Sequence, residues 1–239
     1  MQIENSVVLV TGANRGIGLA FARELLARGA RKVYAAARNP ATVNLPGVQA
    51  LQLDVTKPDE IAAAVRQAAD VALVINNAGI AQPGGFLAED SEAVARRMFE
   101  TNFYGVLNVS KAFAPVLKAN GGGALLNVLS AGSWINGGEL AAYSASKSAA
   151  WALTNSLRHE LAAQKTQVLG LHMAYVDTDL TRGFEVPKTS PETIVQRALD
   201  ALAAGAEEVL ADALTEQVKQ GMTAPRPLYL PQGHGNGTP

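Results

Sequence analysis

An apolar run near the start of the chain leads directly into a cluster of glycines, and this junction constrains the fold more than any other segment. Val7–Val10 has the character of a short buried strand, and the apolar residues of LAFARELLARG recur at helical spacing. Between them stands TGANRGIG, which contains Gly12, Gly16 and Gly18. Gly12 permits a tight turn, Gly16 lets a ligand approach the backbone, and Gly18 lets the helix pack close to the strand. A strand, a glycine-rich turn and a helix predict the first unit of a doubly wound α/β fold.

Strands and helices are expected to alternate along the rest of the chain. The expected strands span Val7–Val10, Lys32–Ala37, Gln49–Leu53, Val71–Ile75, Ala124–Leu129, Gln167–His172 and Glu208–Leu210. The expected helices span Ile17–Arg28, Pro58–Ala68, Ser91–Lys118, Ala141–Ala163 and Pro191–Ala204. This alternation predicts a single Rossmann-type domain with a central parallel sheet of about seven strands and helices on both faces. We expect the domain to occupy residues 1–222, and residues 223–239, rich in Pro and Gly, to form a flexible tail.

Composition argues against several other classes of protein. A hydrophobic content of 48% is enough to bury such a sheet on both faces, and a net charge of −1 gives no basis for binding nucleic acid or an anionic membrane. The chain has no cysteine, which excludes disulfides and thiolate chemistry. His159 and His172 have no clustered ligand partners in the sequence, so we expect no metal site. The chain shows neither a signal peptide nor an apolar stretch near the ~20 residues of a membrane span, so we expect a cytoplasmic protein.

The glycine-rich turn predicts a dinucleotide site, because the N–H groups and positive dipole end of the following helix attract a pyrophosphate. In a Rossmann unit an acidic residue at the end of the second strand binds the ribose 2′-hydroxyl of NAD. Here that strand ends with Ala37, and Arg38 follows. Arg38 and Arg15 can bind a 2′-phosphate through charge-assisted hydrogen bonds, although both could instead be solvated surface charges. We therefore expect NADP(H) as the cofactor.

Tyr143 and Lys147 stand four residues apart in the segment YSASK, a spacing that places both on one face of a helix. A neighbouring ammonium favours the phenolate, so Lys147 is expected to lower the pKa of Tyr143. A phenol tuned in this way can exchange a proton with a carbonyl or alcohol oxygen. Taken alone, the same spacing is also common on helices that only cover a surface.

Three motifs, TGANRGIG, NNAG at residues 76–79 and YSASK, together resemble the short-chain dehydrogenase/reductase family over residues 11–178. The resemblance implies an NADPH-dependent carbonyl reductase that also acts as an alcohol dehydrogenase. It implies a catalytic tetrad made of Asn102, Ser130, Tyr143 and Lys147.

Each member of the tetrad has an implied role. Ser130 would orient the substrate oxygen, and Tyr143 would transfer the proton. Lys147 would bind the nicotinamide ribose, and Asn102 would hold a water that supplies protons. Asn is a poor helix former, so its position inside a long helix favours a functional or kink-forming role. Ser133 is an alternative to Ser130, but it lies ten rather than thirteen positions before Tyr143.

The resemblance also implies the coenzyme contacts. Asp54 and Val55 would meet the adenine ring, Val176 and Thr178 the carboxamide, and Asn76 would either line the coenzyme site or tie neighbouring strands together. The full expected set is Gly12, Asn14, Arg15, Gly16, Ile17, Gly18, Arg38, Asp54, Val55, Asn76, Ala78, Gly79, Tyr143, Lys147, Val176 and Thr178.

The segment that follows the sixth strand departs from the family pattern. Met173-Ala174 replaces the usual Pro-Gly pair, and the part that forms the substrate lid in the family is short. We expect an open pocket for a hydrophobic ketone or aldehyde, although its candidate lining residues could equally be ordinary core: Trp134, Leu140, Tyr175 and Phe184.

The sequence leaves the assembly and the exact reaction open. We expect a homodimer formed through the two long helices, with a monomer or a tetramer as alternatives. Imine reduction, enone reduction or epimerisation on the same scaffold stay open as reactions, as does a non-catalytic NADP(H)-sensing protein.

Overall fold

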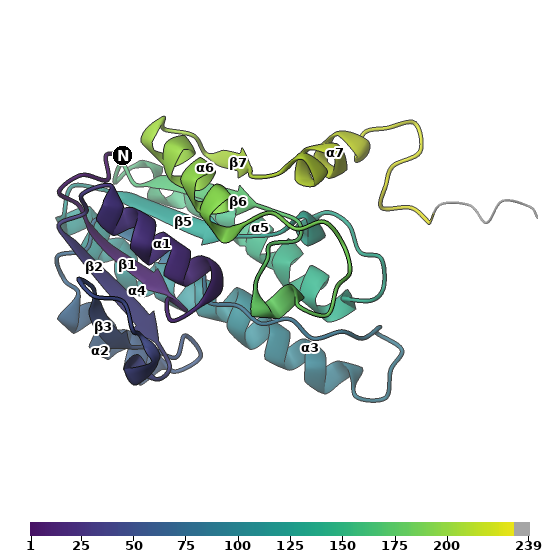
Figure 1. Ribbon diagram of the computed structural model, residues 1–239, viewed down its shortest axis with the longest axis horizontal. Coiled ribbons are helices and arrows are strands. Elements are labelled where there is room, and N and C mark those ends of the chain that lie inside the picture. Colours follow the sequence, from purple (N-terminus) through teal and green to yellow (C-terminus); the bar gives the residue numbers. More distant parts are fainter. Residues whose placement is uncertain (232–239) are drawn as a thin grey trace, which may run out of the picture.

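A computed structural model describes residues 1–231, which form one seven-stranded sheet (Figure 1). The strands are β1 (Val7–Thr11), β2 (Lys32–Ala37), β3 (Gln49–Gln52), β4 (Leu73–Asn76), β5 (Ala124–Val128), β6 (Gln167–His172) and β7 (Glu208–Leu210). All neighbouring strands are parallel, in the order β3-β2-β1-β4-β5-β6-β7. The predicted doubly wound α/β fold is therefore confirmed. Residues 232–239, the end of the expected tail, lie outside the described residues.

Both faces of the sheet are covered by helices. The helices α1 (Gly16–Ala27) and α6 (Pro191–Ala203) lie on one face, and α2 (Pro58–Gln67), α4 (Gly105–Ala119) and α5 (Ala141–Ala162) pack on the other. Within β1, Val8 and Val10 join the first core and Val7 and Leu9 the second, as the twofold period of a strand requires. No helix of residues 1–231 is long and apolar enough to cross a membrane.

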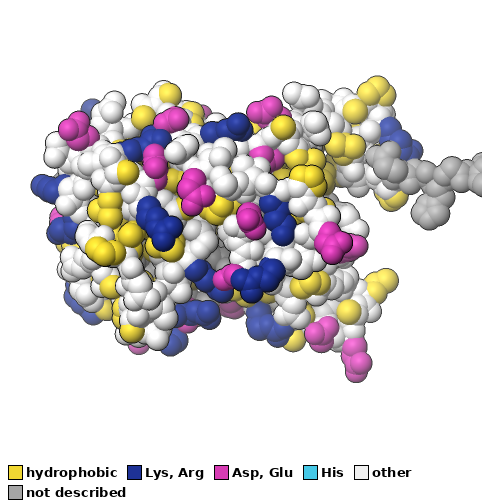
Figure 2. All heavy atoms as spheres, viewed as in Figure 1, with side chains coloured by type: hydrophobic (Ala, Val, Ile, Leu, Met, Phe, Trp, Pro, Cys, Tyr) yellow, Lys and Arg dark blue, Asp and Glu magenta, His cyan; other side chains and the backbone are white. Residues whose placement is uncertain are grey.

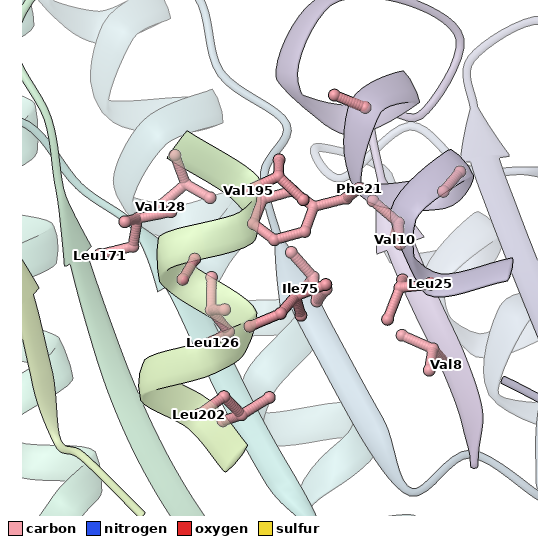
Figure 3. Packing of buried hydrophobic residues seen from close by; sticks show 14 of the residues in the cluster. Val8, Val10, Phe21, Leu25, Ile75, Leu126, Val128, Leu171, Val195 and Leu202 are labelled. Atoms are coloured by element: carbon pink, nitrogen blue, oxygen red, sulfur yellow. The ribbon is translucent and has the colours of Figure 1, made fainter. Parts of the chain in front are cut away.

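The core between α1, α6 and the sheet is built from large apolar side chains. Phe21 of α1 and Val195 of α6 approach each other above Ile75 of β4 (Figure 3). All three side chains are fully buried. This packing fixes α1, and with it the glycine-rich turn that precedes α1, against the centre of the sheet.

The long helix expected over Ser91–Lys118 is interrupted by one wide turn. The helix α3 (Ser91–Phe99) runs into the π-helical turn η2 (Glu100–Tyr104), which continues directly as α4. Such turns often occur at functional sites. Asn102 lies inside η2 and is fully buried, which agrees with the expected kink-forming role.

A short helix near the C-terminus, α7 (Ala213–Gly221), was not expected from the sequence. It is only nine residues long, so its apolar repeat is too brief to stand out. Asp212 caps it, because Oδ1 accepts from the N–H and the hydroxyl of Thr215 over 2.8 and 2.9 Å. Oδ2 of Asp212 accepts from the N–H of Ala174 over 2.8 Å. One buried carboxylate thus joins α7 to the segment that follows β6.

Replacing this carboxylate is expected to loosen both segments. Asp212→Ala should lower the free energy of unfolding by roughly 1–3 kcal/mol, because it removes a helix cap and leaves buried N–H groups unpaired. Asp212→Asn, which keeps an oxygen acceptor, should lower the free energy of unfolding by a smaller amount. Urea unfolding checks both, with the exposed Gln217→Ala as a control on the same helix. An Asp212→Ala variant as stable as this control would contradict the anchoring role.

Candidate active site

The loops at the carboxyl ends of the strands surround an open cleft of about 1060 Å³. It lies where the strand order reverses between β1 and β4, which is the usual ligand position in open α/β sheets. The turn between β1 and α1 stands beside the segment that follows β6 (Figure 1), and the ion pair Arg15–Asp179 joins them at 3.4 Å. Lys and Arg side chains gather toward the middle of this face (Figure 2).

The cleft brings together almost all of the expected coenzyme residues. Those that line it are Gly12, Asn14, Arg15, Gly16, Ile17, Arg38, Asp54, Val55, Ala78, Gly79, Tyr143, Lys147, Val176 and Thr178. The exceptions are Gly18 and Asn76, which lie behind the lining. The set comes from the loops and helix starts that follow six different strands, β1 to β6, so the fold itself assembles it.

The glycine-rich turn is packed tightly against the loop after β4. Gly12 has φ +66° and Gly16 φ +53°, a region that side chains with a Cβ rarely adopt. A Cβ on Gly12 would lie 3.0 Å from the Cα of Ala78, and one on Gly18 only 2.2 Å from the carbonyl oxygen of Gly12. Gly18 therefore serves close packing of α1, as the sequence predicts.

Two residues that the sequence analysis passed over hold this turn in place. Asn77 donates from Nδ2 to the carbonyl oxygens of Thr11 and Gly12, over 2.9 and 3.2 Å. Thr11 in return accepts at Oγ1 from the N–H groups of Asn77 and Ala78, each over 3.0 Å. Both residues belong to the motifs TGANRGIG and NNAG, so the sequence already contained the pattern that marks them as part of this turn.

The adenine-side candidates form a charged group at one end of the cleft. The Arg15 side chain is 67% exposed, and Arg38 is exposed as well. Burial alone would raise the pKa of the Asp54 carboxyl, but hydrogen bonds from Thr56 and the nearby charges of Lys57 and Arg38 outweigh it and lower that pKa. Asp54 is therefore held as a carboxylate near the exposed Arg38 guanidinium.

Tyr143 and Lys147 lie in the first turns of α5 and face the same cleft. The Nζ atom of Lys147 is 5.9 Å from the centre of the Tyr143 ring and donates to the carbonyl oxygen of Val128 over 2.8 Å. Only 4% of Lys147 is exposed. Burial lowers its pKa to about 8, so the ammonium form still predominates at neutral pH.

The expected lowering of the Tyr143 pKa is wrong for this structure. Burial raises the pKa of Tyr143, and a hydrogen bond from Ser130 offsets only part of that rise. The cost of desolvating a phenolate exceeds what the Ser130 hydrogen bond returns. Tyr143 is therefore a neutral phenol that carries its proton at neutral pH, which suits a proton donor.

Ser130, not Ser133, is the serine that meets Tyr143. Ser130 lies just after β5 and caps the short helical turn Ala131–Ser133. Its Oγ accepts from the N–H of Gly132 over 3.0 Å. The Ser133 hydroxyl is buried and has no hydrogen-bond partner among residues 1–231. The structure thus separates the two alternatives that the sequence offered.

Asn102 is held by three hydrogen bonds of its side chain. Oδ1 accepts from the N–H of Ile80 over 2.9 Å, while Nδ2 donates to the carbonyl oxygen of Ile80 over 2.9 Å and to Oγ of Ser146 over 3.0 Å. The amide therefore clamps the loop after β4 to η2 and to α5. Both hydrogens of Nδ2 are used, so a water bound by Asn102 would have to donate to Oδ1 or to the main-chain oxygen.

Asn76 lies in the sheet and not in the cleft. Its Nδ2 donates to Oδ1 of Asn127 over 2.9 Å and to Oγ of Ser110 over 3.0 Å. Asn127 donates in turn to Oγ1 of Thr154 over 2.9 Å. This buried chain of polar groups joins β4, β5, α4 and α5, so the strand-tying alternative describes Asn76.

The four expected substrate residues do not line this cleft. Trp134 is 8% exposed and packs beside Trp151, with ring centres 6.3 Å apart, in a cluster with Val218 of α7. The rings of Tyr175 and Phe184 pack on each other at 5.5 Å, and Leu140 caps α5. The unexpected helix α7 explains why Trp134 is core. Apolar lining comes from other residues: Ile80, Leu129, Met173 and Leu180.

Arg96 and Arg97 also line the cleft, from α3. Arg97 donates to Oε1 of Gln82 over 3.0 Å, and Arg96 pairs with Glu92 one turn away. No motif marks these arginines in the sequence, where they resemble any charged helix surface.

Comparison with known proteins identifies the family. A family model described as short chain dehydrogenase matches residues 6–188. D-erythrulose reductase of Gallus gallus is 38% identical over 180 residues, which cover 73% of this chain and 72% of the relative. Galactitol 2-dehydrogenase (L-tagatose-forming) of Cereibacter sphaeroides is 35% identical over 191 residues, or 75% of each chain.

A solved structure extends the match to the whole fold. The crystal structure of a short chain dehydrogenase from Burkholderia cenocepacia J2315 in complex with NADP superposes with a TM-score of 0.90. It is 41% identical in sequence and covers 95% of this chain and 96% of its own. The glycine-rich turn, the Tyr143–Lys147 pair and the extent of these matches confirm the resemblance: the chain belongs to the short-chain dehydrogenase family of oxidoreductases.

Proposed function

We propose that this protein reduces a ketone or aldehyde to an alcohol with NADPH, and oxidises the alcohol in the reverse direction. The observation that carries the proposal is that a protonated phenol, Tyr143, and a buried ammonium, Lys147, face the same cleft as the glycine-rich turn. A proton donor beside a dinucleotide site is what carbonyl reduction requires.

The residues of the cleft suit an NADP(H) coenzyme. Gly12 and Gly16 leave the backbone bare where a pyrophosphate would approach, and the N-terminus of α1 points its N–H groups there. Arg15 and Arg38 supply cations for a 2′-phosphate, and no acidic residue ends β2. The NADP complex of the 41% identical Burkholderia protein supports the same choice. When bound, the coenzyme supplies the hydride.

Each side chain of the tetrad has a role in this proposal. Tyr143 gives its proton to the substrate oxygen, and Ser130 donates a hydrogen bond that orients that oxygen. The positive charge of Lys147 stabilises the phenolate that forms. Asn102 keeps the loop after β4 in place.

The substrate class is tested with a panel of carbonyl compounds. We expect NADPH absorbance to fall when a ketone or aldehyde is added, and the two relatives named for D-erythrulose and L-tagatose add ketoses to the hydrophobic compounds of the panel. Imines, enones and epimerisable sugars serve as competing arms. Tight NADPH binding without turnover of any carbonyl compound would contradict the proposal.

Arg38→Asp is expected to reverse the coenzyme preference. A carboxylate repels a 2′-phosphate, and a charge-assisted hydrogen bond is worth about 1.5–3 kcal/mol, so the KM for NADPH should rise roughly 10–100-fold. The KM for NADH should stay the same or fall. Steady-state kinetics with both coenzymes checks this, with Arg23→Asp as the control, because Arg23 is an exposed residue of α1 outside the cleft. Equal losses for both coenzymes would contradict the role of Arg38.

A further inference from the structure

A buried histidine, His172, lies directly behind the serine of the active site. It is the last residue of β6 and is completely buried. Its Nδ1 atom is 3.2 Å from the main-chain oxygen of Ser130. A carbonyl oxygen only accepts hydrogen bonds, so this contact is a hydrogen bond in the tautomer that carries its proton on Nδ1.

The surroundings keep the His172 ring in one orientation. The indole of Trp134 stacks on it, with ring centres 3.9 Å apart and planes 20° from parallel. Nε2 faces Oε1 of Glu208 at 3.5 Å and has no hydrogen-bond partner among residues 1–231. Lys219 pairs with Glu208 at 3.1 Å and lies 4.3 Å above the Trp134 ring, so both charges beside the imidazole are themselves paired. Burial lowers the pKa of His172, which keeps the ring neutral.

The bond from His172 completes the restraint of the Ser130 main chain. The residues on either side are tied to β6 and to the residue that follows it. Leu129 donates to the oxygen of Leu171 over 2.7 Å, and Ala131 donates to the oxygen of Met173 over 2.8 Å. The oxygen of Ser130 is satisfied by the His172 side chain. A rotation of this peptide unit would move Cβ and Oγ of Ser130 away from Tyr143.

We propose that His172 is a positioning residue for the reaction: its Nδ1–H holds the Ser130 main chain so that the hydroxyl faces Tyr143 and the substrate oxygen. The inference rests on the proposed function, because it assigns a purpose to His172 only if Ser130 takes part in turnover.

Two amide variants separate the positioning role from simple packing. The side-chain nitrogen of Asn reaches the place of imidazole Nδ1, whereas that of Gln reaches the place of Nε2. His172→Asn should therefore keep most of kcat, and His172→Gln should lose about tenfold or more, since small misplacements of reacting groups are costly. The KM for NADPH should be unchanged in both. Equal kcat losses in the two variants, or none in either, would overturn the proposal.

A double variant tests whether His172 acts through Ser130. In a Ser130→Ala background, His172→Gln should cause no further loss of kcat, because the group that it positions is already gone. Additive losses would mean that His172 acts elsewhere and would overturn the proposal. Thermal unfolding of each variant shows whether the comparison is made on folded protein.

A measurement on the unaltered protein covers the case in which the variants fail to fold. Nitrogen-15 NMR of the full chain, which has three histidines, should show a neutral imidazole protonated at Nδ1. A ring protonated only at Nε2 would remove the donor to Ser130 and overturn the proposal. Failure of the proposed function can be told apart from failure of the His172 proposal. If the proposed function is wrong, the unaltered enzyme and Tyr143→Phe would show the same absence of turnover.

Discussion

Tyr143→Phe is expected to lower kcat by about 10²–10⁴-fold, because it removes the hydroxyl group whose proton general acid catalysis transfers. The ring that packs in the cleft is retained, so NADPH binding should be nearly intact. The measurement is steady-state kinetics on the best carbonyl substrate, together with a fluorescence titration of NADPH.

Tyr175→Phe is the matched control for the loss of a phenol. Tyr175 packs on Phe184 and does not line the cleft, so the loss of the Tyr175 hydroxyl should leave kcat almost unchanged. A Tyr143→Phe enzyme that keeps its rate within about tenfold, a barrier change near 1.4 kcal/mol, would rule out Tyr143 as the acid.

Gly18→Ala is expected to disrupt the coenzyme site without touching any reacting group. The new Cβ would lie 2.2 Å from the carbonyl oxygen of Gly12 and 2.5 Å from Nδ2 of Asn77, so α1 and the turn must move apart. Overpacking of this kind costs roughly 1–3 kcal/mol of stability. The Kd of NADPH should rise about tenfold or more, which corresponds to a loss of at least ~1.4 kcal/mol of binding.

Gly137→Ala provides the comparison for this second variant. Apart from Gly137 and its two chain neighbours, no heavy atom of residues 1–231 lies within 4 Å of a Cβ built there, so the same methyl group should be tolerated. Calorimetric titration with NADPH and thermal unfolding measure both effects. Unchanged affinity in Gly18→Ala would mean that the turn does not contact the coenzyme.

The sequence motifs predicted most of the fold and most of the residues that line the cleft. A strand, glycine-rich turn and helix have one common arrangement, so Gly12, Gly16 and Arg15 could be placed from spacing alone. The helix α7 could not, since its stability depends on the tertiary contact of Asp212 with Ala174 and not on a long apolar repeat.

Side-chain environments were harder to predict than positions. The Tyr143–Lys147 pair was placed correctly, but the direction of the Tyr143 pKa was not, because the sequence shows the neighbouring charge and not the burial. Trp134 failed as a cleft residue for a related reason. In the sequence, an aromatic residue that faces a ligand cannot be told from one that packs, as Trp134 does, against a helix that was not expected.

The chain of amides in the middle of the sheet has a consequence for how the strands pair when the protein folds. Asn76 and Asn127 are paired across β4 and β5, in direct register. If one strand slipped by a residue, both amides and the hydroxyls of Ser110 and Thr154 would be stranded in an apolar interior, each with its hydration lost. The strands β4 and β5 can therefore pair in a single register.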